Sequence, residues 1–162
     1  MNLPPSPTAH SPARATHAVI AACTRLEPFL YAVLRIGFGA IILSHGLPKA
    51  LGTGHGSMAD PMASSTALIE RALHLPFTHE LAVLVMLLET LGGVMLMLGL
   101  RVGPVALLLA LEMAGIACAL GPAWAWIDRG IEYPVLMGLL ALYMATRGAG
   151  ACSVDGRLRA RG

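Results

Sequence analysis

The sequence contains four apolar segments that are long enough, or nearly long enough, to cross a lipid bilayer, and ionisable residues lie within them. We predict spans at about residues 29–51, 81–100, 102–120 and 133–150, because about 20 apolar residues at 1.5 Å per residue match the hydrocarbon core. A charge at that depth costs several kcal/mol unless it meets a partner or water inside the protein. The residues concerned are Arg35, His45, Glu89 and Glu112, with Glu132 at the edge of the last segment. These residues are the first candidates for a functional site.

Composition supports contact with lipid. Apolar residues make up 56% of the 162 residues and charged residues only 12%, a balance that suits lipid contact better than a solvated surface. The net charge of +2 is small and scattered, so no nucleic-acid partner is expected. We therefore predict an all-α, integral membrane four-transmembrane-helix bundle.

The sequence divides into three parts. Residues 1–28 are rich in Pro, Ser, Thr and Ala without periodicity, and we expect a flexible cytoplasmic tail. Residues 29–150 form the membrane domain, in which residues 65–75 are expected to form a short helix on the membrane surface. Residues 151–162 form a basic cytoplasmic tail. Lys and Arg are most numerous in both tails and around Arg101, and the positive-inside rule therefore predicts that both termini are cytoplasmic.

The second and third spans form a predicted hairpin that carries two carboxylates. Glu89 lies twelve residues before Arg101 and Glu112 eleven after it, so both should lie roughly 16 to 18 Å from the turn. Each begins a Glu-x-x-Gly pattern, in which the small residue lets another helix approach closely. If the two acids face each other, they share a proton or bind a cation. Alternatively, one of them anchors a helix contact as a protonated acid.

Basic residues occupy the first span. Arg35, Gly39, Ile42, Gly46 and Lys49 share one helix face. Arg35 lies roughly 9 Å from the inner surface, and we expect it to pair with Glu89; the alternative is that its side chain extends to the inner headgroups.

His45 is the only histidine within a predicted span. It could shuttle a proton or hydrogen-bond a ligand, or it could be an ordinary packing residue. A haem between two membrane histidines would need a second such histidine. The histidines of the first loop lack the i, i+4 spacing of metal ligands, and no metal site is predicted.

At these residues the chain resembles the DoxX family of small four-helix membrane proteins. The resemblance rests on Arg35, on the run His45-Gly46-Leu47-Pro48-Lys49, on Glu89-Thr90-Leu91-Gly92-Gly93, on Glu132-Tyr133-Pro134 and on Ser153-Val154-Asp155. It covers about residues 29–155. The long segment before Phe29, the extended first loop and Glu112 depart from the family pattern.

The resemblance implies a redox-linked subunit of the bacterial cytoplasmic (inner) membrane. Its relatives include quinone-reducing thiosulfate oxidoreductase subunits and a protein of methylamine dehydrogenase maturation, and many members have no assigned activity. We expect His45 and Glu89 to be catalytic, and a quinone headgroup or an equivalent polar ligand to be bound by the residues Arg35, Lys49, Glu112, Glu132 and Tyr133.

The sequence contains no haem, flavin or iron–sulfur motif, so a protein partner should supply the electrons. Whether the chain is an enzyme stays open, as does its oligomeric state, a homo-oligomer included. The competing functions are a small proton-coupled or solute transporter and a non-catalytic membrane scaffold.

Overall fold

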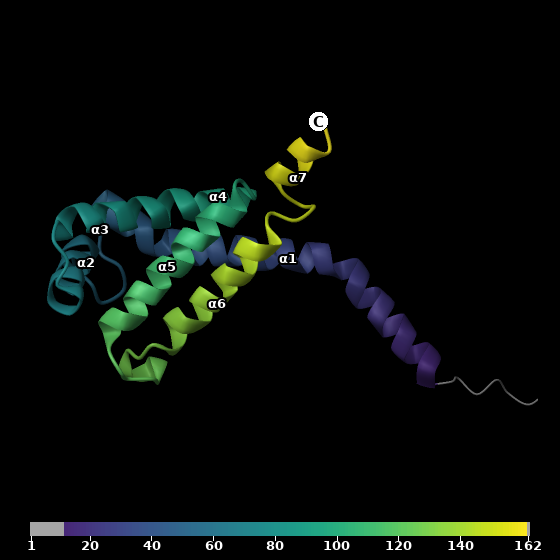
Figure 1. Cartoon of the computed structure of the whole chain (residues 1–162), viewed down its shortest axis with the longest axis horizontal. Helices are drawn as coiled ribbons and strands as arrows, with labels where there is room; N and C mark the ends of the chain where they lie inside the picture. The colour runs from purple at the N-terminus through teal and green to yellow at the C-terminus, as the bar shows by residue number, and fades with distance from the viewer. Residues whose placement is uncertain (1–11, 162) are drawn as a thin grey trace, which may run out of the picture.

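The computed structural model describes residues 12–161, which form helices joined by short loops (Figure 1). The long helices are α1 (Pro12–Leu51), α5 (Val102–Leu120), α6 (Glu132–Arg147) and a helix in three consecutive parts, α3 (Thr78–Leu87), η2 (Leu88–Gly92) and α4 (Gly93–Leu98). The short ones are α2 (Pro61–Leu68), η1 (Ile69–Leu73), η3 (Trp126–Asp128) and α7 (Val154–Arg159). None of the described residues forms a strand, and the all-α prediction is confirmed.

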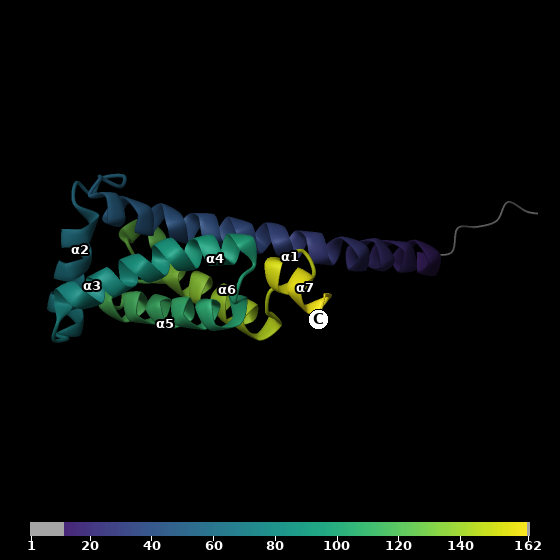
Figure 2. The ribbon, with the colours of Figure 1, turned by 90° about the horizontal axis from the view of Figure 1, so that it is seen from above.

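Helix α1 begins at Pro12 and runs through Pro28 to Leu51. The prediction of an irregular tail is therefore wrong for residues 12–28, while residues 1–11 lie outside the described residues. The physical reason is that this stretch is rich in Ala, the best helix former, and extends an existing helix without a new nucleation step. Figures 1 and 2 show the extension projecting beyond the bundle. The division into domains stays a prediction.

Within residues 12–161, three helical stretches are long and apolar enough to cross a membrane: residues Ile20–Leu51, Thr78–Leu98 and Val102–Leu120. They correspond to the first three predicted spans. Many large apolar side chains point outward from the helices, among them Leu84, Leu91, Leu111 and Leu139, as expected where the solvent is lipid. Helix α6 has 16 residues, Glu132–Arg147; it lies at the fourth predicted segment, 133–150, but ends three residues before it, and its role as a fourth span stays a prediction.

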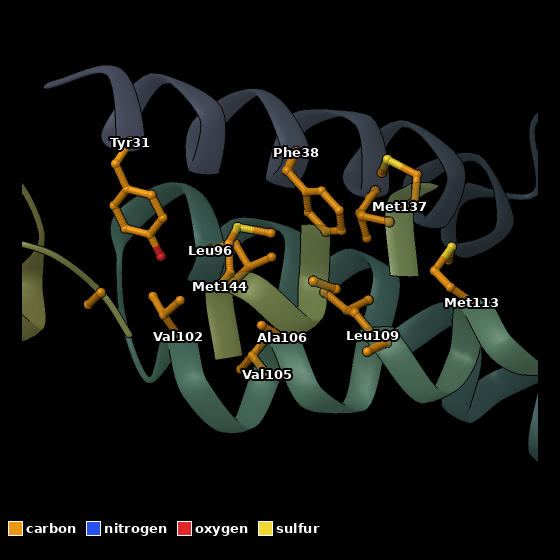
Figure 3. Packing of buried hydrophobic residues seen from close by; sticks show 14 residues of the cluster. Tyr31, Phe38, Leu96, Val102, Val105, Ala106, Leu109, Met113, Met137 and Met144 are labelled. Atoms are coloured by element: carbon orange, nitrogen blue, oxygen red, sulfur yellow. The ribbon is translucent and has the colours of Figure 1, made fainter. Parts of the chain in front are cut away.

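The long helices share one apolar core, which Figure 3 shows from close by. Phe38 of α1, Leu96 of α4, Leu109 of α5 and Met137 of α6 all lie in this core. The Tyr31 hydroxyl also donates a hydrogen bond to the Gly148 carbonyl just after α6. Tyr31 therefore links α1 to the segment that follows α6.

Two glycines end helices where the chain must turn. After α1, the backbone N–H of Thr53 donates a hydrogen bond to Pro48 O at 3.0 Å, and Gly52 has a φ of 63°. After α4, the backbone N–H of Leu100 donates to Met95 O at 2.9 Å, and Gly99 has a φ of 73°. In both cases the glycine adopts the left-handed conformation that this helix ending requires. The turn after Gly99 leads directly into α5, and Figure 2 shows α4 and α5 side by side. The predicted hairpin is confirmed.

The predicted short helix of the first loop is present but begins earlier, at Pro61. Asp60 caps it by accepting a hydrogen bond from Ala63 N at 2.9 Å, and a proline at the first helical position needs no donor there. The position of this helix on the membrane surface stays a prediction.

Candidate functional site

Arg35 is almost completely buried, at 1% exposure, and it bonds only to backbone carbonyls among the described residues. It donates hydrogen bonds to the oxygens of Leu96, Met97 (3.0 Å) and Cys152 (2.8 Å). Two of these carbonyls belong to the end of α4, where carbonyls lack helical partners and the helix dipole favours a cation. The prediction that Arg35 pairs with Glu89 is wrong, and so is the alternative that it extends to the headgroups. Arg35 instead joins α1, α4 and the C-terminal segment.

The register between α1 and the α3–α4 helix explains this difference. A Cβ atom on Gly39 would lie 2.6 Å from Gly93 O, and one on Gly46 would lie 2.6 Å from Thr90 N. These close approaches place Glu89 level with residues 43–46 of α1. Arg35 is then roughly 12 to 17 Å away along the axis at 1.5 Å per residue, beyond the reach of its side chain.

Lys49 is the partner of Glu89. Its Nζ donates to Oε1 at 2.8 Å and to Oε2 at 2.6 Å, and the two side chains are only 10% and 5% exposed. Lys49 lies beyond the level of Glu89 on α1, and its long side chain extends back toward it. Removing one partner of a buried ion pair destabilises a protein strongly when the other charge is left without any counter-charge.

The backbone around Glu89 departs from regular α-helix. Glu89 lies in η2, a wider π-helical turn of five residues, and such turns occur frequently at functional sites. Gly92, the small residue of the Glu-x-x-Gly pattern, faces α5, where a Cβ would lie 3.2 Å from Val105 Cγ1. The predicted close approach is therefore present at Gly92, whereas a Cβ on Gly115 would meet nothing within 4 Å.

Glu112 of α5 adds a second carboxylate to the ion pair. Both of its oxygens are buried and accept no hydrogen bond from a donor among the described residues, and the Glu89 carboxylate lies within hydrogen-bonding range of them. The charges that act on it are those of Glu89 and Lys49, so the hairpin brings the two acids together as its symmetry about Arg101 predicted. One ammonium and two carboxylates leave one negative charge over, which a single proton would neutralise.

His45 completes the group of side chains that the structure brings together. It is half-buried and lies in electrostatic range of Glu89 and Lys49. Its ring also contacts that of His55 in the first loop, with centroids 4.7 Å apart and planes tilted by 57°. His55 is not among the site residues predicted from the sequence, although the glycines on either side of it indicate a turn. We call His45, Lys49, Glu89 and Glu112 the polar cluster.

Glu132 and Tyr133 lie elsewhere, at the start of α6. Together with Trp124, Val135, Leu136 and Leu139 they line an open, largely apolar hollow of about 550 Å³. Helices α5 and α6 are aligned by two close contacts, Gly138 of α6 against Met113 of α5 and Gly103 of α5 against Ala145 O of α6. This alignment places Glu132 roughly 9 Å from Glu112 along the helix axis. The structure does not bring these two predicted ligand-binding residues into the polar cluster.

Among residues 12–161, no three His, Cys, Asp or Glu side chains are placed to hold a metal ion.

The fold and the polar cluster together define a class: an all-helical membrane protein with a buried ion pair and a second buried acid between apolar helices. A family model described as DoxX matches residues 30–122, more than half of the chain and all four residues of the polar cluster. The protein belongs to the DoxX family, as the sequence motifs predicted. No curated protein and no solved structure matches this chain.

Proposed function

We propose that this chain is a four-span subunit of a redox system in the bacterial inner membrane, and that its polar cluster holds the headgroup of a quinone. As the fourth span, the 16 residues of α6 would cover roughly 24 Å, with the apolar segment continuing toward Gly150. The distribution of Lys and Arg supports cytoplasmic termini.

The observation that carries the proposal is the buried carboxylate of Glu112, which lies beside Glu89 with no hydrogen-bond donor to its oxygens among the described residues. Buried polar atoms in proteins are normally hydrogen-bonded, and those that are not call for an explanation. Besides the two Glu112 oxygens, the Thr90 hydroxyl is buried without a partner among the described residues. A polar ligand with oxygen atoms, together with a proton on Glu112, would satisfy these groups.

The donor set fits a quinone headgroup. Lys49 can donate to a carbonyl oxygen, and so can Glu112 when it holds a proton. A bound quinone takes up two electrons and two protons when it is reduced. The role of this chain would be to orient the ring, exclude water and keep a proton at the Glu112 carboxyl. The electrons would come from a partner protein, since the chain contains no redox motif of its own.

The proposal is tested by gentle purification of the native complex, followed by mass spectrometry of its proteins and lipids. We expect quinone to copurify with the wild-type protein and to be strongly depleted in Glu112→Leu, which removes the donor at this position. The matched control is Glu27→Gln, since Glu27 is an exposed acid that pairs with Arg147 away from the cluster. Wild-type protein that carries no quinone and binds none when it is added would refute the proposal.

The same experiment series distinguishes the competing functions. In proteoliposomes, ligand-dependent proton flux that is lost in Glu89→Gln would instead support a proton-coupled transporter. If His45→Ala and Glu89→Gln fold normally and leave cellular function intact, the chain is a scaffold and the polar cluster serves helix packing.

A further inference from the structure

The polar cluster lies between apolar helices, so a proton that it holds must arrive along some route. Water does not cross an apolar core, and proton transfer between buried groups needs side chains within hydrogen-bonding reach of each other or of a water. The contact between His45 and His55 of the first loop is a connection of this kind.

The loop from Gly52 to Asp60 folds back on α1 and fixes the position of His55. The bond from Thr53 N to Pro48 O reverses the chain directly after α1. His55 and Met58 then exchange two backbone hydrogen bonds, at 2.9 and 3.0 Å, around Gly56 at φ 57°. The ring of His55 is therefore held against His45 by a closed turn.

The two rings lie between the exposed loop and the acids. His55 is half-buried in a loop that is otherwise exposed, and it contacts His45. His45 in turn lies in electrostatic range of Glu89, and Glu89 in range of Glu112. Lys49 is the other charged group that acts on His45.

We propose that His55 and His45 conduct protons between the aqueous face that carries this loop and the carboxyl pair of Glu89 and Glu112. A neutral imidazole accepts a proton on one nitrogen and releases one from the other. A proton taken from water by His55 can thus pass to His45 and then to a carboxylate, after which both rings are neutral again. This inference rests on the proposed function in one respect: the carboxyl pair must hold a proton.

The experiment measures hydrogen–deuterium exchange at the acid itself by infrared spectroscopy of the reconstituted full-length protein. A protonated carboxyl gives a C=O band, which is assigned to Glu112 by its loss in Glu112→Gln. After transfer to D₂O, the rate at which this band shifts reports proton access. We expect His55→Gln to slow the shift by roughly a hundredfold, the lower end of what one positioned proton-transfer group contributes.

Two further variants separate conduction from structure. His79→Gln removes an exposed histidine that lies in the first turn of α3 and lines a hollow away from the polar cluster, and it should leave the rate unchanged. In His55→Ala, added imidazole should restore the rate, which a purely structural effect of the substitution would not allow.

Each result has one interpretation. If the Glu112 band is present but shifts as fast in His55→Gln as in the wild type, the proposed proton route is wrong, and the proposal that Glu112 holds a proton is unaffected. If no protonated carboxyl band is found, the proton-holding acid and the route both fail.

Discussion

Glu112 acts as a reserve partner for Lys49 if the polar cluster holds one proton, and this leads to an unusual prediction for stability. At 2.6 to 2.8 Å and an effective dielectric constant of about 20, the gross attraction between Lys49 and Glu89 is about 6 kcal/mol, before the cost of desolvation. In Glu89→Gln, Glu112 can lose its proton and pair with Lys49 instead. The single substitution should therefore cost only about 1 to 1.5 kcal/mol, the net value of one hydrogen bond.

The double variant should behave differently. Glu112→Gln alone replaces a protonated acid by an amide of similar shape and should cost less than about 1 kcal/mol. Glu89→Gln with Glu112→Gln leaves Lys49 buried without any carboxylate, and this should cost about 3 to 5 kcal/mol. The double variant is then less stable than the two single variants predict together, because residues of one network do not behave additively.

The assay is reversible unfolding in mixtures of mild detergent and dodecyl sulfate, with the free energy of unfolding as the measured quantity. A triple variant that adds Lys49→Met removes the unpaired charge and should recover most of the loss. Additive costs in the double variant would refute the idea of a reserve carboxylate. So would a triple variant that is no more stable than the double.

Four other substitutions test the surrounding structure. Arg35→Met removes the donors to three backbone carbonyls; it should free the C-terminal segment and speed tryptic cleavage in α7, and unchanged cleavage would contradict the role of Arg35. Gly46→Ala places a Cβ 2.6 Å from Thr90 N and should cost about 1 to 3 kcal/mol of unfolding free energy. Gly37→Ala, where nothing lies within 4 Å, should stabilise α1 by about 0.5 to 1 kcal/mol; equal effects at the two glycines would show that the helices do not approach closely. Glu27→Gln breaks an exposed ion pair with Arg147 and should change the unfolding free energy by less than about 1 kcal/mol, so a larger loss would show that this pair anchors the end of α6.

Much of the fold follows from local properties of the sequence. Apolar length predicted the helices, and the short connection at Arg101 predicted the hairpin. Counting residues on each side of that turn also placed Glu89 and Glu112 at one depth, because both helices leave the same turn with the same rise per residue. The first helix was predicted to begin near residue 29, whereas α1 begins at Pro12. Composition alone underestimated how far an Ala-rich segment extends an existing helix.

The partners of the buried charges depend on contacts between segments far apart in the sequence. Two basic residues on one face of α1 could each have met Glu89, and only the register set by the close approach of Gly39 to Gly93 and of Gly46 to Thr90 selects Lys49.

The sequence by itself determined that this protein would be a bundle of apolar helices with ionisable residues at membrane depth, because helix length and apolar composition are properties of each segment alone. Only the tertiary structure decided that Arg35 holds backbone carbonyls, that Lys49 pairs with Glu89 and that His55 contacts His45. These pairings depend on how far one helix or loop is shifted along another, and that shift is fixed by packing between distant residues.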